Sequence, residues 1–391
     1  MQTDEKYINR HFKQILSVLV VAILLCAFCA ICCNMTTIKN AEYENTFDDY
    51  SAENEKKSDK PHFERCIADT RPYVHIGGNS IGISIGAGGL IVIDKCEVNS
   101  ADGQVFPSAR ADIKKGDVIV SVNGEETKSV YKLKSILSNL KNGNVTLRMI
   151  RDGRYFDVKM HAVKDNTGQY KLGLALKEDV GGVGTLTFVT DDGKFGALGH
   201  RINDGESGLE GSLSEGSIFN AEVTGVIKSE KGKAGGLVAE VNRLSKRIGE
   251  IKENSNIGLY GVYNDKATGD LYRIAAKGEA KIGKAQILTT IDGSTPKFYD
   301  IDVVKVVSQS ESAEKGMVIL VRDKELLQKT GGIVQGMSGS PIVQNGMLIG
   351  AVTHVFVQDP TRGYAVHSRF MYEKASGVSA FCEDEIQREV A

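Results

Sequence analysis

The sequence predicts a mainly β protein in which an N-terminal transmembrane helix precedes two folded units. A length of 391 residues exceeds one domain of about 100–200 residues, and 41% hydrophobic with 25% charged residues is the composition of a chain that buries cores. Residues 15–33 form an apolar run whose only clearly polar member is Ser17. From residue 73 onward, short β-type runs alternate with Gly, Asp and Asn, which predicts strands joined by tight turns.

The composition excludes several classes of protein. The chain has 48 Lys and Arg against 50 Asp and Glu, so its net charge of −2 lacks the basic excess typical of nucleic-acid binding. The 43 glycines follow no tripeptide repeat, which excludes a collagen-like chain. The hydrophobic content excludes global disorder.

The apolar run is predicted to be an uncleaved membrane anchor. At 1.5 Å per residue, residues 15–33 span about 28 Å, close to the hydrocarbon thickness of a bilayer. Lys6, Arg10 and Lys13 precede the run, so residues 1–14 are expected in the cytoplasm and the rest across the membrane. A cleaved signal peptide is the alternative, but its apolar region is normally shorter and ends in a clearer cleavage site. Residues 34–72 are polar and predict a flexible stalk.

The cysteines predict neither a disulfide framework nor a metal site. Four of them lie in the anchor, where cysteine packs as a small hydrophobic residue. Outside it only three remain, an odd number: Cys66, Cys96 and Cys382. No His-x-x-x-His or Cys-x-x-Cys pattern occurs outside the anchor. We therefore expect no metal and no other cofactor.

Residues 73–165 predict a compact α+β unit. Two turn signals, Asn123-Gly124 and Asp152-Gly153, each separate two β-type runs. Between them, apolar residues recur at helical spacing from Val130 to Leu140. The stretch "ARADIKKGDVIVSVNGEE" and the helix after it resemble a PDZ domain.

The resemblance to a PDZ domain implies a peptide-binding strand. In such domains an extended ligand adds as a strand beside a binding strand, and a preceding loop takes a C-terminal carboxylate. The matching loop and strand are expected at Ser80, Ile81, Gly82 and Ile83. The alternative is that the isoleucines of this strand fill a core and bind nothing.

Residues 171–375 predict an all-β barrel or sandwich, and residues 376–391 a polar tail. Within the second unit, "QGMSGSPIV" resembles the Gly-Asp-Ser-Gly-Gly-Pro turn of trypsin-like serine peptidases. On that alignment Ser338 is the nucleophile, and the backbone N–H groups of Gly336 and Ser338 form the oxyanion hole. The Gly-x-Ser-x-Gly elbow of α/β-hydrolases does not match, because residue 340 is serine.

A serine nucleophile needs a base and a group that orients it. His200 follows an apolar run and ends "FGALGH", a place where a side chain can project, while His354 and His367 remain alternatives. Asp323 ends another apolar run and is the candidate that orients the base. Spacing alone leaves four competitors for that role: Asp204, Asp292, Asp300 and Asp302.

Four stretches resemble the stage IV sporulation protein B (SpoIVB) peptidases of endospore-forming bacteria. They are "KLGLALKEDVGGVGTLTF", "KFGALGH", "GKAQILTTIDG" and "GGIVQGMSGSPIVQNGMLIGAVTHVFVQDPTRGYAVH". The resemblance implies a trypsin-like double β-barrel with a triad in the order His, Asp, Ser. His200 and Ser338 match through their motifs, and Asp323 matches as the acidic residue fifteen positions before the serine.

The resemblance also implies a biological role. Such peptidases cross the inner forespore membrane, process themselves, and cleave a regulator of an intramembrane protease, which releases a late mother-cell sigma factor. We therefore expect a membrane-anchored serine endopeptidase whose catalytic part faces the space between forespore and mother cell. The alternative is a non-catalytic signalling scaffold that presents a PDZ module.

Overall fold

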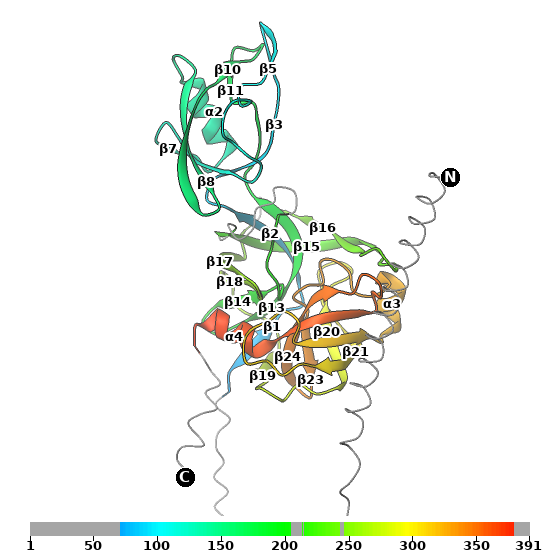
Figure 1. Cartoon of the computed structure of the whole chain (residues 1–391). Coiled ribbons are helices and arrows are strands. Elements are labelled where there is room, and N and C mark those ends of the chain that lie inside the picture. Colours follow the sequence, from blue (N-terminus) through cyan, green and yellow to red (C-terminus); the bar gives the residue numbers. More distant parts are fainter. Residues whose placement is uncertain (1–70, 205–212, 214, 243–245, 379–391) are drawn as a thin grey trace, which may run out of the picture. The chain divides into compact units, whose positions relative to one another are not determined.

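The computed structural model describes residues 71–204, 213, 215–242 and 246–378. Most of the described strands join one large sheet that closes on itself twice. Figure 1 shows the labelled strands and helices along the chain. The predicted anchor at residues 15–33, residues 34–70 of the predicted stalk and residues 379–391 of the tail lie outside the described residues. Among the helices that are described, none is long and apolar enough to cross a membrane.

The first closed ring contains six strands and holds the segment that leads to His200. Its order is β14-β18-β17-β15-β2-β13, and β13 pairs with β14 to close it. The bounds are β2 Ser80–Gly86, β13 Val180–Val189, β14 Lys194–Ala197, β15 Glu215–Ile227, β17 Gly249–Ser255 and β18 Gly258–Tyr263. β16, Gly236–Val241, forms a hairpin with β15. Buried side chains such as Phe195, Ile218 and Leu259 belong to one apolar cluster in this ring.

The second closed ring also contains six strands and holds the segment around Ser338. Its order is β24-β23-β20-β21-β22-β25, and β24 pairs with β25 to close it. The bounds are β20 Gly283–Thr289, β21 Lys297–Val306, β22 Met317–Val321, β23 Pro341–Gln344, β24 Met347–Val355 and β25 Arg362–His367. Two rings of six antiparallel strands are the double β-barrel predicted for the peptidase unit.

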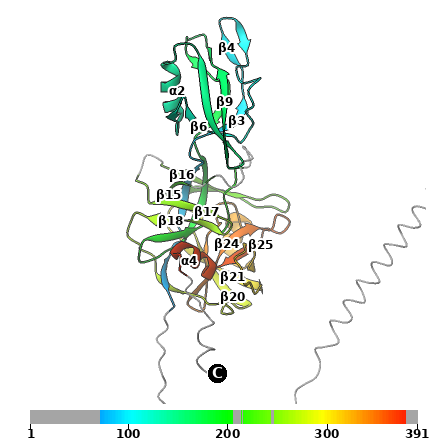
Figure 2. The same cartoon turned by 60° about the vertical axis from the view of Figure 1, so that its left-hand side comes forward.

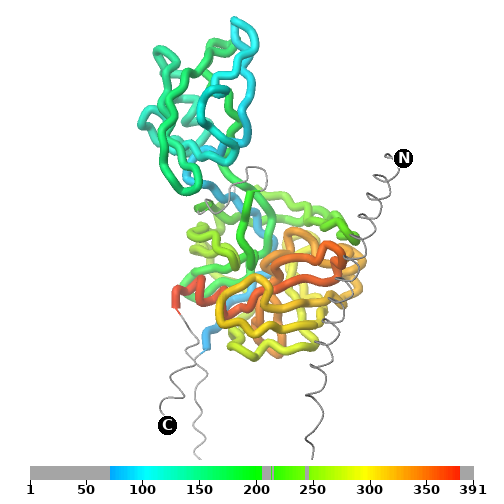
Figure 3. Tube along the Cα trace, in the orientation of Figure 1, coloured from blue at the N-terminus to red at the C-terminus, as the bar shows by residue number. Residues whose placement is uncertain are grey.

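Two short strands join the barrels. β1, Tyr73–Ile76, pairs with β13 of the first barrel and with β19, Leu271–Ile274, which in turn pairs with β24 of the second. Figure 3 follows this path by colour, with the first described residues (blue) beside strands from late in the sequence. The chain therefore begins its described part inside the peptidase fold.

The PDZ-like unit is built on a second sheet. Its order is β12-β3-β6-β8-β9, and β7 also pairs with β6. The bounds are β3 Leu90–Lys95, β6 Val118–Val122, β7 Glu125–Glu126, β8 Asn144–Arg151, β9 Arg154–His161 and β12 Leu174–Lys177. Two small ladders complete it: β4 Val98–Ser100 with β5 Gly103–Val105, and β10 Val163–Lys164 with β11 Tyr170–Lys171.

Local sequence explains the elements of this unit. Asn123-Gly124 and Asp152-Gly153 all have positive φ, which type I′ hairpin turns require. Helix α2, Val130–Ser138, begins at Ser129, whose side chain accepts a hydrogen bond from the Lys132 N–H. It buries the apolar stripe predicted from periodicity, including Leu133, Ile136 and Leu137.

Two further helices are described, and both end at a left-handed glycine. α3, Lys324–Thr330, precedes the nucleophile turn, and α4, Ser368–Ser376, follows β25. Figure 2 shows α4 near β24, and its Phe370 and Met371 belong to the same buried cluster as Leu348 of that strand.

The strand pairing changes the predicted boundaries. β1 and β2 were expected in the PDZ-like unit of residues 73–165, but they pair within the barrel sheet. Conversely β12 was expected in the peptidase unit of residues 171–375, but it pairs with β3 of the PDZ-like sheet. The two units therefore exchange strands across both predicted limits.

Candidate active site

Ser338 lies in a turn shaped by two glycines between α3 and β23. Gly336 and Gly339 have φ values of +98° and +94°, a region that glycine enters without steric cost. Ser338 is partly exposed, whereas Ser340 is 0% exposed. The Ser340 hydroxyl lies 2.6 Å from the carbonyl oxygen of Met337. Of the two serines, only Ser338 is accessible from the surface.

The backbone of this turn leaves two donors unused. The N–H groups of Met337, Gly339 and Ser340 donate to carbonyl oxygens at 2.8–3.2 Å. The hydrogen bonds of the described residues give no acceptor for the N–H groups of Gly336 and Ser338. These are the two groups predicted to form the oxyanion hole, and free donors beside a nucleophile suit the developing charge of a tetrahedral intermediate.

Two buried threonines hold the turn from β13. The Thr185 hydroxyl donates to the carbonyl oxygen of Gly336 at 2.8 Å, and the Thr187 hydroxyl donates to that of Gly339 at 2.7 Å. The Thr185 N–H also donates to the carbonyl oxygen of Ser338 at 2.9 Å. The stretch "GTLTF" resembles the family, but the sequence does not reveal that its threonines hold the turn, because these contacts span more than 150 positions.

His200 follows β14 through a left-handed bend. Leu198 and Gly199 have φ values of +69° and +76°, and a buried leucine in this region is a strained residue of the kind found at functional sites. The Leu198 N–H donates to the carbonyl oxygen of Thr185, the residue that also binds the Ser338 carbonyl. Thr185 therefore ties the predicted base and the predicted nucleophile together.

The side chain of His200 is oriented by a backbone carbonyl. Its Nδ1 lies 2.9 Å from the carbonyl oxygen of Arg201, so in the neutral ring Nδ1 carries the proton and Nε2 is left to act as a base. The Ser338 hydroxyl donates to the carbonyl oxygen of Thr353 at 2.7 Å, and no hydrogen bond among the described residues joins it to His200. Such catalytic contacts commonly form only when substrate is bound.

The two alternative histidines have different surroundings. The His354 ring stacks on that of His200, with centroids 4.8 Å apart, and its Nδ1 lies 3.9 Å from Glu314. Burial, followed by the charge of His200, lowers the pKa of His354. The His367 Nε2 contacts the carbonyl oxygen of Val307 at 3.0 Å, and burial lowers the pKa of His367. Sequence reasoning did not predict that His354 packs against His200.

No hydrogen bond or ion pair among the described residues joins Asp323 to His200. Its carboxylate accepts the Leu326 N–H at 2.9 Å and thereby caps the N-terminus of α3. The expected orienting role of Asp323 stays a prediction.

The competing carboxylates also have other partners. Asp204 pairs with Lys177, Asp302 with Arg322, and Asp292 with Lys329, while Asp300 accepts a hydrogen bond from Gln286. Across the described ranges, no group of three or more His, Cys, Asp or Glu side chains is placed to hold a metal ion.

The structure corrects the predicted peptide-binding strand. Ser80, Ile81, Gly82 and Ile83 lie in β2, which pairs with β13 on one side and with β15 on the other. A strand with two partners offers no edge to a peptide. The isoleucines are buried in the barrel core, and a Cβ on Gly82 would lie 2.2 Å from Val241. The isoleucines of β2 therefore fill a core, as the alternative from the sequence stated.

Parts of this chain are similar to known protein families and solved structures. A PDZ domain model matches residues 79–161. Among solved structures, the active form of the Rv3671c protease from M. tuberculosis is 13% identical over 48% of this chain and 70% of its own, with a TM-score of 0.28. Human heparin binding protein is 10% identical over 50% and 84%, with a TM-score of 0.26. Similarity at these TM-scores adds nothing to the fold that the strand pairing shows. A search of curated proteins gave no match.

A second family model covers the segment that contains both His200 and Ser338. The SpoIVB peptidase S55 model matches residues 168–372, just over half of the chain, and these limits include His200 and Ser338. The chain therefore belongs to the SpoIVB peptidase S55 family and is a serine endopeptidase with a PDZ domain.

Proposed function

We propose that Ser338 and His200 carry out peptide hydrolysis at the junction of the two barrels. The observation that carries this proposal is the turn at Ser338, where a partly exposed hydroxyl lies beside two N–H groups without an internal acceptor. Family membership makes the chain a peptidase. A scaffold without catalysis, the alternative from the sequence, does not account for this arrangement.

The reaction follows from the placement of these groups. The Ser338 oxygen attacks the carbonyl carbon of the scissile bond while its proton passes to Nε2 of His200. The N–H groups of Gly336 and Ser338 bind the oxyanion, and His200 then gives the proton to the leaving amine. In deacylation His200 takes a proton from water, which attacks the acyl-enzyme, and returns that proton to the Ser338 oxygen as the acid leaves. The Arg201 carbonyl accepts the Nδ1–H of His200, which leaves Nε2 free to take a proton whenever the neutral ring acts as a base.

We further propose the setting that the family resemblance implies. The apolar run at residues 15–33, with Lys6, Arg10 and Lys13 before it, supports a single membrane span that leaves the peptidase on the extracytoplasmic side. In a sporulating cell this is the space between forespore and mother cell. The expected substrates are the chain itself and a protein that regulates an intramembrane protease.

The test uses the full chain in detergent micelles, as wild type, Ser338→Ala, His200→Ala and the double variant. We expect new N-termini to appear only in the wild type. The labelling of wild type by a fluorophosphonate should be lost in both single variants. Because members of a catalytic unit do not contribute additively, the double variant should be no less active than either single one. Self-cleavage by Ser338→Ala would contradict the assignment.

A further inference from the structure

The end of β24 contacts both catalytic candidates. Thr353 and His354 are consecutive residues of this strand. The carbonyl oxygen of Thr353 accepts the Ser338 hydroxyl at 2.7 Å. The His354 ring packs against that of His200, with centroids 4.8 Å apart and planes inclined by 38°. Two neighbouring residues of the second barrel therefore hold the nucleophile and the base.

Glu314 contacts both of these residues from the segment between β21 and β22. Its backbone carbonyl oxygen accepts the hydroxyl of Thr353, a buried side chain, at 3.0 Å. One oxygen of its carboxylate lies 3.9 Å from Nδ1 of His354. The hydrogen bond fixes the backbone of Glu314 next to β24, so its carboxylate stays near the His354 ring. Because the Glu314 side chain is only 33% exposed, water and salt screen its charge less than that of a fully exposed group.

His354 leads from His200 to a carboxylate. During acylation the Ser338 proton moves to Nε2 of His200, and a nearby negative charge stabilises the imidazolium that forms. The contacts of the described residues join His200 to no carboxylate directly. They join it to the His354 ring, and that ring lies next to Glu314. Glu314 is therefore placed to act on His200 across one intervening ring.

The neutral form of His354 suits this arrangement. A second imidazolium against His200 would repel the positive charge that forms there. Burial, followed by the charge of His200, lowers the pKa of His354, and Lys315 also lowers it, whereas Glu314 raises it. Because the net direction is downward from an ordinary value of about 6.5, His354 is neutral near pH 7.

We propose that His354 and Glu314 are positioning residues of this peptidase. The neutral His354 ring holds His200 in place, and the Glu314 carboxylate behind it stabilises the imidazolium that forms when His200 takes the proton of Ser338. Both residues act through His200 and not on the substrate. This inference rests on the proposed roles of Ser338 and His200.

The role of the carboxylate is tested by the pH dependence of fluorophosphonate labelling. Labelling of the full chain in detergent needs neutral His200, so its rate rises with pH to a plateau. Glu314→Gln removes the charge that favours the imidazolium. We expect the midpoint of the profile to move to lower pH by about 0.5 unit or more, and the plateau rate to fall about threefold or more, because a weaker base also removes the serine proton more slowly. Glu314→Asp, which keeps a carboxylate, should restore part of both changes.

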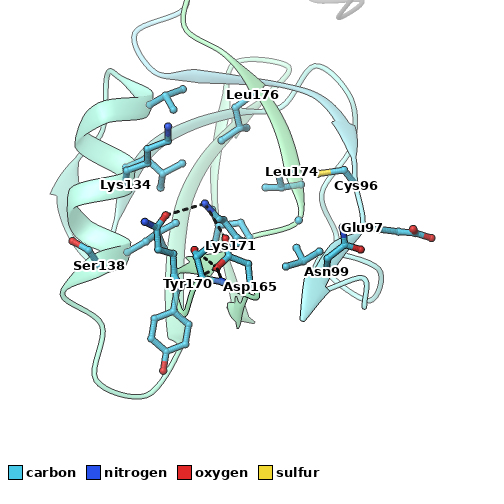
Figure 4. Close-up of a pocket in the computed structure, with 18 of the residues that line it drawn as sticks. Cys96, Glu97, Asn99, Lys134, Ser138, Asp165, Tyr170, Lys171, Leu174 and Leu176 are labelled. Atoms are coloured by element: carbon cyan, nitrogen blue, oxygen red, sulfur yellow. Dashed lines mark hydrogen bonds and ion pairs between the residues drawn. The ribbon is translucent and has the colours of Figure 1, made fainter. Parts of the chain in front are cut away.

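Two carboxylates serve as matched controls. Glu311 is exposed in the same segment, three positions before Glu314, so Glu311→Gln removes an equal charge from the same loop. Asp165 lies 3.4 Å from Lys171 within the PDZ-like unit, as Figure 4 shows. Glu311→Gln and Asp165→Asn should both keep the wild-type midpoint. A loss of fold alone would lower the plateau rate and leave the midpoint in place.

The role of the ring is tested by two replacements of His354. His354→Phe keeps an aromatic ring against His200, whereas His354→Ala removes it. Because a small misplacement of a catalytic group slows a reaction strongly, we expect the phenylalanine variant to label at least about fivefold faster than the alanine variant. Urea unfolding of both variants confirms that the folded proteins are compared. Equal labelling rates would overturn the positioning role of His354.

The outcomes separate this inference from the proposed catalysis. An unmoved midpoint in Glu314→Gln, or the same shift in Glu311→Gln, would contradict the role of the carboxylate. Absence of labelling in every sample would instead contradict the catalytic roles of Ser338 and His200. The histidine ring signals in NMR spectra of Ser338→Ala, titrated with and without Glu314→Gln, would then still decide the link. A lower midpoint for His200 in the double variant supports it, and an equal midpoint overturns it.

Discussion

Thr187→Val removes one hydrogen bond from the turn that carries the nucleophile and leaves its shape almost unchanged. The Thr187 hydroxyl is fully buried and donates to the carbonyl oxygen of Gly339, the residue after Ser338, at 2.7 Å. Valine fills the same volume but cannot donate, so the carbonyl stays buried without this partner. A buried acceptor that loses its donor costs about 1–3 kcal/mol. We expect the free energy of unfolding to fall by an amount in this range.

The same change should slow the chemistry of Ser338. The Gly339 N–H still donates to the carbonyl oxygen of Val352 at 2.8 Å, so the turn persists but loses one of the two threonine hydroxyls that hold it. If about 1–2 kcal/mol of positioning is lost, the labelling rate falls roughly 5–30-fold. Urea unfolding measures the free energy of unfolding. The rate of fluorophosphonate labelling, under conditions in which both proteins are fully folded, measures the reactivity of Ser338.

A matched control separates the two effects. Thr224 is exposed, and its hydroxyl lies 3.4 Å from the carbonyl oxygen of Val238, so Thr224→Val should change stability by no more than about 0.5 kcal/mol. A Thr187→Val variant that is destabilised but labels at the wild-type rate would refute the argument that this threonine positions the nucleophile.

Three further variants test other parts of the site. Ser340→Ala should keep measurable labelling of Ser338 while it lowers the free energy of unfolding by about 1–3 kcal/mol, because it removes a buried hydrogen-bonding group; complete loss of labelling in a folded variant would contradict this. Asp323→Asn should keep wild-type labelling within about twofold, since asparagine caps a helix as well as aspartate does; a loss of 100-fold or more would show that the Asp323 carboxylate orients the base. Burial lowers the pKa of His367 in the folded state, so the unfolded state binds more protons below about pH 6.5 and the free energy of unfolding falls on acidification. His367→Gln should therefore lose less of its free energy of unfolding than wild type between pH 7.5 and pH 5.5. Melting temperatures of the two proteins that fall in parallel over this range would contradict this.

Local features of the fold follow from the sequence. Turn residues at Asn123-Gly124 and Asp152-Gly153 predict the two hairpins, because few residue pairs adopt two successive positive φ values. Helical spacing predicts α2 and its buried face. The Ser338 turn is predicted through its glycines, whose freedom a projecting serine requires.

Long-range pairing could not be predicted in the same way. β2 and β12 have similar apolar patterns and both follow a loop with glycine, so alternation does not tell which strand lies beside β3. The pairing of β2 with β13 and β15 decides this, and it also predicts the effect of Gly82→Val. Since a side chain there meets Val241 within the barrel, we expect that variant to destabilise the peptidase fold and to lose labelling of Ser338.

The contacts of the site show the same limit. The family resemblance suggested Asp323 for the group that orients His200, but nothing in the sequence indicated the two contacts that the structure shows. The Arg201 carbonyl lies at Nδ1 of His200, and His354 packs against its ring. A backbone carbonyl has no signature in the sequence, since every residue has one. The buried threonines of β13 were likewise indistinguishable from ordinary strand residues until the turn at Ser338 was placed against them.

The most direct test of the catalytic assignment is to identify the residue that a fluorophosphonate modifies. The full chain is labelled in detergent as wild type and as His200→Ala, digested, and the modified peptide is sequenced by mass spectrometry. The structure predicts that the label lies on Ser338 in the wild type and that His200→Ala takes up almost none. Label on Ser340, or equal labelling of Ser338 in the two proteins, would contradict the assignment of Ser338 and His200 as nucleophile and base.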